Sequence, residues 1–252
     1  MVQNSTVSDE RLARALGVYA GMVGRVLANP ERWLGLDEDP PPTAKFPVRA
    51  LDAIRDRTFG ETTPASDHWK DQPVRKRVDW WVTRIGISAG LAAAAPRFAG
   101  ALADRIPLQA ALGASAAGLA VCATAREHGR TAPADWVPLL AKVLFDRDLA
   151  SATAPVPASE ESEHRLATAP DQSQDKRGGV AKLSRGAQRA AKTLWQLART
   201  FLDLQNLLDE RPRGGLFART LAKIPVVGIA GGGLDERGGI RKAASETTRL
   251  LS

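Results

Sequence analysis

The sequence is poor in cysteine, histidine and aromatic residues, and each shortage excludes a class of site or fold. The 252 residues include one Cys, three His and one Tyr, and aromatic residues make up 5% of the chain. The lone Cys122 cannot form an intramolecular disulfide, and its place in an apolar segment indicates a buried thiol. Alanine takes the place of the bulky residues that a sheet would need, which favours helices.

Motifs for catalysis or cofactor binding are missing as well. We find no nucleophile motif and no cluster of His, Cys and acidic residues. The glycines at 231–233 lack Gly-Lys-Ser/Thr, a long preceding strand and an acid about 20 residues on, so we interpret them as a turn or a close-packed helix start. His68 has no second His or Cys at ligand spacing, which is typical of an ordinary surface residue. We therefore expect no catalytic, cofactor-binding or metal-binding residues.

Two acidic features leave an alternative open. Residues 146–148 read Asp-Arg-Asp, a triplet that elsewhere can hold a divalent metal, but here it stands at a predicted helix end without an α/β pattern. A solvated charge cluster is the favoured interpretation. The sequence also leaves open that four distant residues converge in the fold: Asp79, Asp104, His128 and Asp146.

The chain carries a positive net charge of +7, from 35 Lys and Arg against 28 Asp and Glu. This excess indicates an anionic partner, such as a phospholipid surface or nucleic acid. Nucleic acid is the least favoured, because no recognised motif supports it and the charge is spread along the chain. The beginning of the sequence lacks the basic-then-apolar pattern of a signal peptide, so we expect a cytoplasmic protein, with attachment at the inner face of the membrane left open.

One Ala/Gly-rich stretch, residues 85–125, dominates what is present. It reads IGISAGLAAAAPRFAGALADRIPLQAALGASAAGLAVCATA. Small residues four apart allow two helices to approach closely. We predict one helix from about Val82 to Ala103, kinked or broken near Pro96, and a second from Pro107 to Glu127 that Gly129 ends. Together they would form a central helical hairpin.

The second helix of this hairpin raises the question of a membrane span. Ile106 to Ala125 is uncharged over 20 residues, which is long enough to cross a bilayer. Few of its side chains are large and aliphatic, and no Trp or Tyr closely flanks it, so a buried core helix is favoured over a span. Lying against a membrane surface is the intermediate case.

Helical spacing of apolar residues predicts the remaining helices. Their expected ranges are Ser8 or Asp9 (N-cap candidates) to Asn29, Val48 to Thr58, Pro73 onward, Asp135 (N-cap candidate) to Leu149, Leu183 to Leu208, and Ile240 to Leu251. The helix from Leu183 has small and neutral residues beside its heptad seam, which favours packing within its own chain over a coiled coil.

These elements predict an all-α fold, a multi-helix bundle around the Ala/Gly-rich hairpin. Residues 1–150 form its N-terminal helical part and residues 181–252 form C-terminal helices that pack on that part. Residues 151–180 are rich in Ala, Pro, Ser and acids and have almost no large apolar side chain, so we predict a disordered linker there.

Two basic clusters are the candidate interaction sites. Arg75, Lys76 and Arg84 stand near Trp80, which falls on the polar side of its predicted helix. An exposed Trp80 would resemble an interfacial anchor or a stacking platform, but we favour the alternative that it packs under another helix or a loop. The second cluster opens the helix from Leu183 and includes Arg185, Arg189 and Lys192. Basic residues at a helix start oppose the helix dipole, which indicates an anionic partner.

Three segments resemble the EcsC family of bacterial proteins. They are residues 123–129 (ATAREHG), with His128 in place of the family's aromatic residue, the following Pro-Ala-Asp-Trp helix, and residues 223–228 (KIPVVG) with trailing glycines. The family's usual Asn after the glycines is absent, and Asp235 stands nearest. The resemblance implies an all-helical domain that is often membrane-associated, encoded near an ABC transporter in the namesake case, and without an established catalytic activity.

We therefore expect a non-enzymatic accessory protein of EcsC type that binds a membrane surface or a membrane protein. The alternative is a soluble helical domain with a pocket for a small molecule or lipid between its helices, which could be an enzyme.

Overall fold

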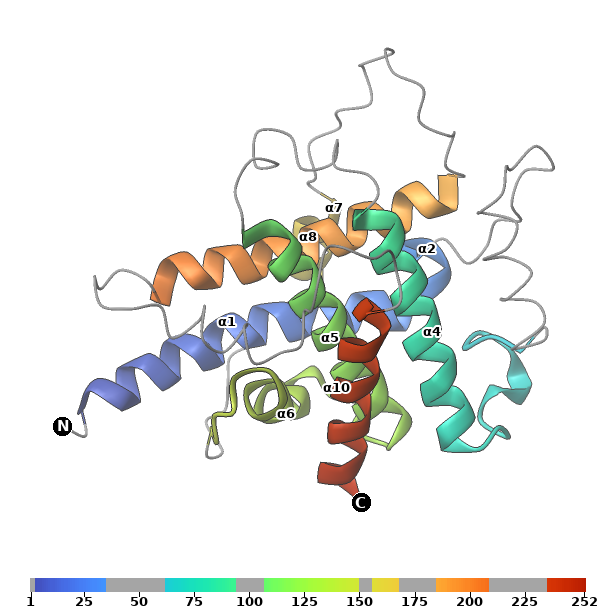
Figure 1. Cartoon of the computed structure of the whole chain (residues 1–252), viewed down its shortest axis with the longest axis horizontal. Coiled ribbons are helices and arrows are strands. Elements are labelled where there is room, and N and C mark those ends of the chain that lie inside the picture. Colours follow the sequence, from blue (N-terminus) through green and yellow to red (C-terminus); the bar gives the residue numbers. More distant parts are fainter. Residues whose placement is uncertain (1–2, 35–61, 94–106, 150–155, 168–184, 209–234) are drawn as a thin grey trace, which may run out of the picture.

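The computed structural model describes residues 3–34, 62–93, 107–149, 156–167, 185–208 and 235–252, and all regular structure in these ranges is helical. This confirms the predicted all-α class. The elements shown in Figure 1 are α1 (Gln3–Ala28), α2 (Pro30–Leu34), the 3₁₀ turn η1 (Asp67–Trp69), α4 (Val74–Ala93), α5 (Pro107–Glu127), α6 (Pro133–Phe145), α7 (Ser159–Ala167), α8 (Arg185–Leu208) and α10 (Asp235–Leu251).

Helix α5, the Ala/Gly-rich segment, occupies the centre of the bundle. It packs against α1, α4, α6, α8 and α10, and every residue from Ala114 to Ala125 is buried. A helix that is apolar on all sides needs such surroundings, and its small side chains let five neighbours approach. The core-helix interpretation is confirmed. Within the described ranges, no helix combines the length and the apolar character that a bilayer span requires.

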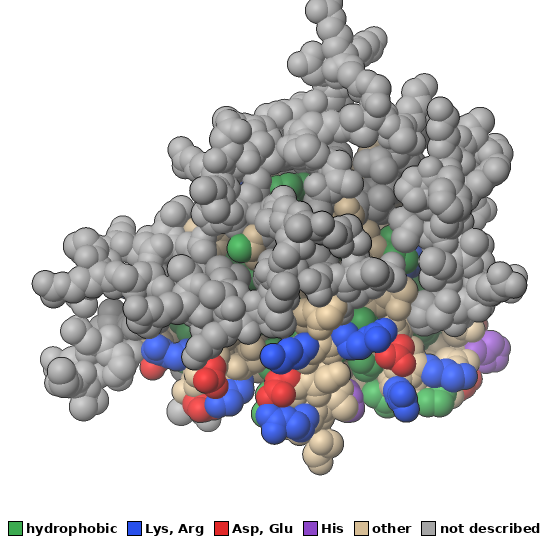
Figure 2. Space-filling model, in the orientation of Figure 1, with side chains coloured by type: hydrophobic (Ala, Val, Ile, Leu, Met, Phe, Trp, Pro, Cys, Tyr) green, Lys and Arg blue, Asp and Glu red, His purple; other side chains and the backbone are tan. Residues whose placement is uncertain are grey.

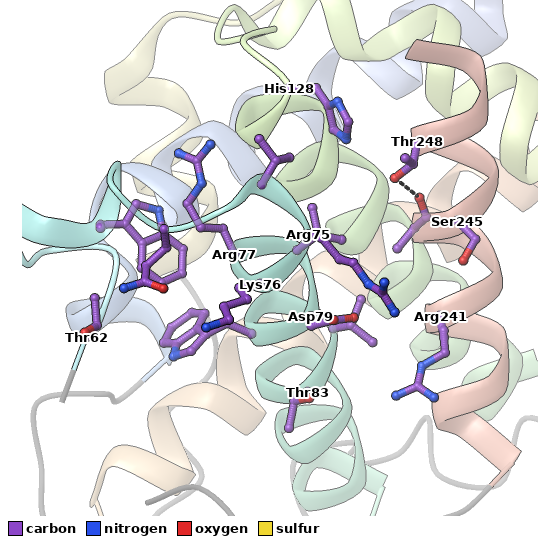
Figure 3. Close-up of a pocket in the computed structure, with 17 residues that line it drawn as sticks. Thr62, Arg75, Lys76, Arg77, Asp79, Thr83, His128, Arg241, Ser245 and Thr248 are labelled. Atoms are coloured by element: carbon purple, nitrogen blue, oxygen red, sulfur yellow. Dashed lines mark hydrogen bonds between the residues drawn. The ribbon is translucent and has the colours of Figure 1, made fainter. Parts of the chain in front are cut away.

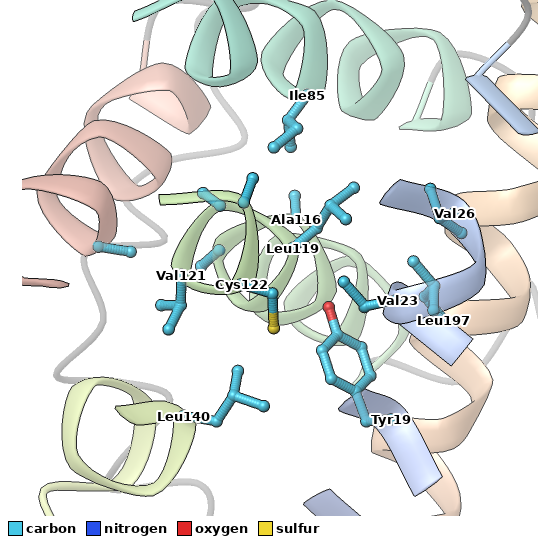
Figure 4. Packing of buried hydrophobic residues seen from close by; sticks show 14 of the residues in the cluster. Tyr19, Val23, Val26, Ile85, Ala116, Leu119, Val121, Cys122, Leu140 and Leu197 are labelled. Atoms are coloured by element: carbon cyan, nitrogen blue, oxygen red, sulfur yellow. The ribbon is translucent and has the colours of Figure 1, made fainter. Parts of the chain in front are cut away.

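Tyr19 of α1 packs closely against α5. Its hydroxyl donates a hydrogen bond to the Ser115 carbonyl oxygen at 2.5 Å, and its ring packs edge-on against Phe201 of α8 with centroids 4.7 Å apart. A Cβ on Gly118 would stand 2.8 Å from the tyrosine oxygen, so only glycine fits there. Burial raises the pKa of both Tyr19 and the neighbouring Cys122 thiol (Figure 4).

Local signals place the end of α5 correctly and the ends of α6 less well. Gly129 has φ 88°, and the amides of Gly129 and Arg130 bond back to the carbonyls of Arg126 and Ala125, which is a Schellman cap. Helix α6 begins at Pro133, so Asp135 lies in its first turn and is not the N-cap. It stops before the predicted Leu149.

Helix α6 stops early because Asp146 takes the left-handed conformation, with φ 51°. The Asp146 amide bonds the Lys142 carbonyl and the Arg147 amide bonds the Ala141 carbonyl, which closes the helix. The Asp146–Asp148 triplet is a local charge cluster, since Lys142 Nζ lies 3.5 Å from one carboxylate and 3.0 Å from the other.

The first helices differ from the prediction mainly in their bounds. Helix α1 begins at Gln3, upstream of the N-cap candidates Ser8 and Asp9, and Asp9 instead pairs with Arg147. A single helix, α4, runs from Val74 to Ala93 beside α5. Its predicted continuation to Ala103, with the break near Pro96, lies outside the described residues, as do the helix at 48–58 and the glycines at 231–233.

The C-terminal helices pack on the N-terminal part. Helix α8 lies against α5, α4, α1 and α2, with Leu194, Leu197 and Phe201 almost fully buried. The prediction that it packs within its own chain is confirmed. Helix α10 begins at Asp235, earlier than the predicted Ile240, and packs on α5 and α4.

Within the predicted linker, the prediction of disorder is wrong for residues 159–167. These residues form α7, which packs on α1 through the buried Ser162 and Leu166. Glu163 pairs with Arg25 of α1 and with Arg32 of α2, the latter at 2.7 Å. Composition alone missed this helix because α1 and α2 supply the groups that hold it. The rest of the predicted linker, apart from residues 156–158, lies outside the described residues.

Candidate functional site

A cavity of about 1070 Å³ opens between α4, α10 and the segment that carries η1 (Figure 3). Helix α4 supplies most of its lining, α10 supplies one side, and the end of α5 contributes His128. The lining residues are Thr62, Trp69, Gln72, Val74, Arg75, Lys76, Arg77, Val78, Asp79, Trp80, Val82, Thr83, His128, Arg241, Ala244, Ser245 and Thr248. We refer to this cavity as the α4–α10 pocket.

The polar side of the pocket is strongly basic. Arg75 and Lys76 of α4 and Arg241 of α10 are exposed, and none of them forms an ion pair with the acids of the described ranges. The described lining holds one carboxylate against them, that of Asp79. Figure 3 shows Arg75, Asp79 and Arg241 on the same side of the pocket, where α4 faces α10. An anion entering here would meet a positive field with little competition.

The start of α4 adds to this field. Arg75, Lys76 and Arg77 occupy its first turn, which has no acidic residue. The amino end of a helix carries a partial positive charge, so cations there are unfavourable for the helix itself. A bound anion would relieve this repulsion.

A buried carboxylate, that of Glu127 at the end of α5, holds two lining residues of the pocket, Trp69 and Arg77. Its oxygens accept hydrogen bonds from the indoles of Trp69 at 3.2 Å and Trp81 at 2.9 Å, and they lie 3.1 Å from a guanidinium nitrogen of Arg77. The side chains of Arg77 and Glu127 are only 14% and 7% exposed. These three donors satisfy a charge that the carboxyl end of a helix would otherwise disfavour.

Buried apolar residues line the pocket on two sides of α4: Trp69 and Trp80 lie on one side, and Val78 and Val82 lie nearer the side that carries Arg75. Trp80 packs edge-on against Trp69 and Trp81, with ring centroids 5.3 Å and 5.0 Å apart, and the Arg84 guanidinium lies 5.8 Å from its ring. Trp80 is 5% exposed, so the structure corrects its prediction as an exposed interaction residue and agrees with the packed alternative.

The two predicted basic clusters lie apart. Helix α4 begins at the lower right of Figure 1, whereas α8 begins at the upper right, so the basic residues at the two helix starts do not form one surface. Arg189 and Lys192 are partly buried on α8, and Arg185 is the first residue of that helix. The structure places Arg75 and Lys76 in the lining of the same pocket as Arg241, a residue that the sequence did not single out.

The possible convergence of acids with His128 is half realised. Asp79 and His128 both line the α4–α10 pocket (Figure 3), while Asp146 is exposed at the end of α6 and Asp104 lies outside the described residues. No group of three or more His, Cys, Asp or Glu in the described ranges could hold a metal ion. His68 is exposed beside Asp71, in agreement with its interpretation as a surface residue.

Sequence reasoning missed Trp69, Glu127 and Arg241 as parts of one site. Trp69 and Glu127 are 58 positions apart, and no spacing in the sequence links them. The one usable signal was the shortage of aromatic residues, which makes three tryptophans within Trp69 to Trp81 conspicuous.

Comparison with known proteins gives no match: no family model fits the chain, and no similar curated protein or solved structure was found. The resemblance to the EcsC family therefore stays a prediction.

Proposed function

We propose that the protein is a non-enzymatic accessory protein that binds an anionic membrane surface through the rim of the α4–α10 pocket. One observation carries the proposal: Arg75, Lys76 and Arg241 all line this pocket from two helices, exposed and without an ion-pair partner in the described ranges. Figure 2 shows Lys and Arg side chains spread over the lower part of the molecule, where α4 begins and α10 ends.

The expected strength of this contact follows from the number of cations. A Lys or Arg near an anionic bilayer contributes roughly 1 kcal/mol, so three contribute about 3 kcal/mol, or about 100-fold in affinity. Attachment of this size is reversible. It also weakens as salt screens the charges.

Vesicle co-sedimentation tests the proposal. We expect the full chain to sediment with phosphatidylglycerol vesicles and not with phosphatidylcholine vesicles. The triple variant Arg75→Gln, Lys76→Gln, Arg241→Gln should lose about 100-fold in affinity. Its matched control, Arg11→Gln, Arg14→Gln, Arg199→Gln, removes the same charge from exposed positions of α1 and α8. An equal loss of vesicle affinity in both variants would show that binding depends on net charge alone. It would refute the assignment of the membrane contact to the pocket.

A further inference from the structure

We propose that the α4–α10 pocket seats one amphiphilic molecule whose head is a phosphate monoester and whose apolar chain lies along Val78, Val82 and Ala244. The chemical class is an alkyl or lipid phosphate. The inference deepens the proposed function and rests on it for the role of the cations, but it adds a single defined binding site within the surface contact.

The head group follows from the donors. Arg75 and Arg241 approach from opposite helices (Figure 3), and each guanidinium can bind two phosphate oxygens at once. The hydroxyls of Ser245 and Thr248 also line the pocket on this side, whereas Lys76 lines it on the other side of α4 (Figure 3). A phosphate monoester carries about −1.5 to −2 charges near pH 7 and has three free oxygens, so it uses these donors better than a singly charged diester or sulfate does.

Asp79 limits how much negative charge the pocket accepts. Its carboxylate lies on the same side as Arg75 and Arg241 (Figure 3) and would repel a second anionic group. This arrangement favours a single phosphate over a polyphosphate.

The apolar chain follows from the size and the wall of the pocket. The cavity, at about 1070 Å³, is the size of a pocket for a whole organic ligand and far exceeds the needs of a phosphate ion. Val78 and Val82 of α4 line it near Arg75, and Ala244 of α10 also lines it. Because Trp69, Trp81 and Arg84 already pack on Trp80, its ring is not available as a stacking platform for a nucleobase.

Titration of the full chain with soluble probes tests the site, with the tryptophan fluorescence and calorimetric heat as readouts. The probes are octyl phosphate below its micelle concentration, octyl sulfate, inorganic phosphate and octanol. We expect octyl phosphate to bind about tenfold or more tighter than each of the others, because only it offers both the charge and the chain. Equal binding of octyl phosphate and inorganic phosphate would overturn the inference.

Single variants separate head from chain. Arg241→Gln should weaken the binding of octyl phosphate about tenfold, whereas Arg11→Gln should leave its affinity unchanged. Val78→Thr keeps the side-chain volume but makes the apolar lining more polar. It should therefore weaken the binding of octyl phosphate and leave the binding of inorganic phosphate unaffected. Val143→Thr on α6 is its matched control. Circular dichroism confirms that each variant is folded, and a Val78→Thr variant that binds octyl phosphate normally would contradict the chain assignment.

Vesicles distinguish a membrane source from a soluble one. Preference for phosphatidic acid over phosphatidylglycerol at equal surface charge supports a lipid phosphate in the membrane. Binding of octyl phosphate without binding to any anionic vesicle supports the pocket but refutes the proposed membrane function. Suppose instead that vesicle binding depends on Arg75, Lys76 and Arg241, but the soluble probes show no preference for octyl phosphate. That result supports the proposed function and refutes this inference.

Discussion

Gly118 and Gly90 stand on two helices that pack together, α5 and α4, but their surroundings differ. A Cβ on Gly118 would collide with Tyr19 at 2.8 Å, whereas a Cβ on Gly90 would have no atom within 4 Å. Gly118→Ala should destabilise the fold by about 1–3 kcal/mol through overpacking. Gly90→Ala should stabilise it by about 0.5–1 kcal/mol, because alanine loses less backbone entropy in a helix. Urea unfolding measures both, and the same sign for the two variants would contradict the packing described for Tyr19.

Removing the charge of Glu127 leaves the buried Arg77 guanidinium without its charged partner, with only the Glu127 backbone carbonyl, at 3.4 Å, still accepting from it. Glu127→Gln should therefore cost about 3 kcal/mol in the free energy of unfolding. It should also loosen Trp69 and Trp81, which we expect to shift the tryptophan fluorescence of the folded protein. Glu246→Gln is the control, because the pair of Glu246 with Arg249 is exposed and its loss should leave the melting temperature unchanged. A Glu127→Gln variant as stable as the wild type would show that the indoles alone satisfy this site.

How far the sequence predicts single residues depends on the distance of their partners. Gly129 closes α5 through residues three to five positions away, so its role could be predicted from sequence. Periodicity places Trp80 on the polar side of its helix, and it cannot show that Trp69, eleven positions earlier, covers the ring.

Among the helices, α4 carries an electrostatic conflict that makes stability and binding oppose each other. Lys76→Glu places an acid in the first turn, so it should stabilise the helix by about 0.3–1 kcal/mol. The same change should weaken attachment to phosphatidylglycerol vesicles. Thermal unfolding and co-sedimentation of one variant check both effects, and Lys192→Glu on α8 is the control for the loss of vesicle binding. A Lys76→Glu variant that is both less stable and unchanged in binding would contradict the account of α4.

The docking of α7 should depend on pH through Glu163. Hydrogen bonds from Arg25 and then Arg32 hold the pKa of this carboxyl below its usual range, against the effect of burial. Since the folded pKa is lowered, the stabilisation is present above the ordinary glutamate pKa and is lost as the pH falls through the lowered value. We expect the amides of 159–167 to exchange faster as the medium is acidified, before those of α5.

Glu163→Gln should release α7 at neutral pH and remove this dependence on pH, while Glu160→Gln, which is exposed, should not. Hydrogen exchange measured by mass spectrometry reports both. Slow exchange of α7 in Glu163→Gln would mean that Ser162 and Leu166 suffice to hold the helix.

The contrast between α5 and α7 shows which elements a sequence predicts. Helix α5 carries its own signal, since its first nineteen residues, Pro107 to Ala125, are uncharged and favour a buried position. Helix α7 is too short to be stable alone and owes its place to charges on α1 and α2, which its composition does not reveal.

For the whole molecule, the contacts of α5 with five helices predict cooperative unfolding. Ala117 is 1% exposed on α5, and Ala117→Leu should overpack the centre and cost about 1–3 kcal/mol. Because every contacting helix loses the same support, tryptophan fluorescence and circular dichroism should give one shared urea midpoint, shifted downward. Two separate midpoints would show that the α4–α10 side folds independently.

The all-α class followed from the sequence, but the arrangement of the helices did not. The α4–α10 pocket joins Arg75 and Arg241, which lie on helices from opposite parts of the chain, and no motif announces their approach. Tertiary packing of the helices on α5 forms the site. Hydrophobic periodicity predicts which face of a helix is buried, but not which helix covers that face.

The single thiol of Cys122 is 0% exposed on α5. Burial also keeps it protonated, so an alkylating reagent can reach a reactive thiolate only when the central helix parts from its neighbours. The rate of alkylation of Cys122 therefore reports how often α5 separates from its neighbours. In intact cells, the rate at which Cys122 is alkylated would count openings of the whole bundle, without any introduced label.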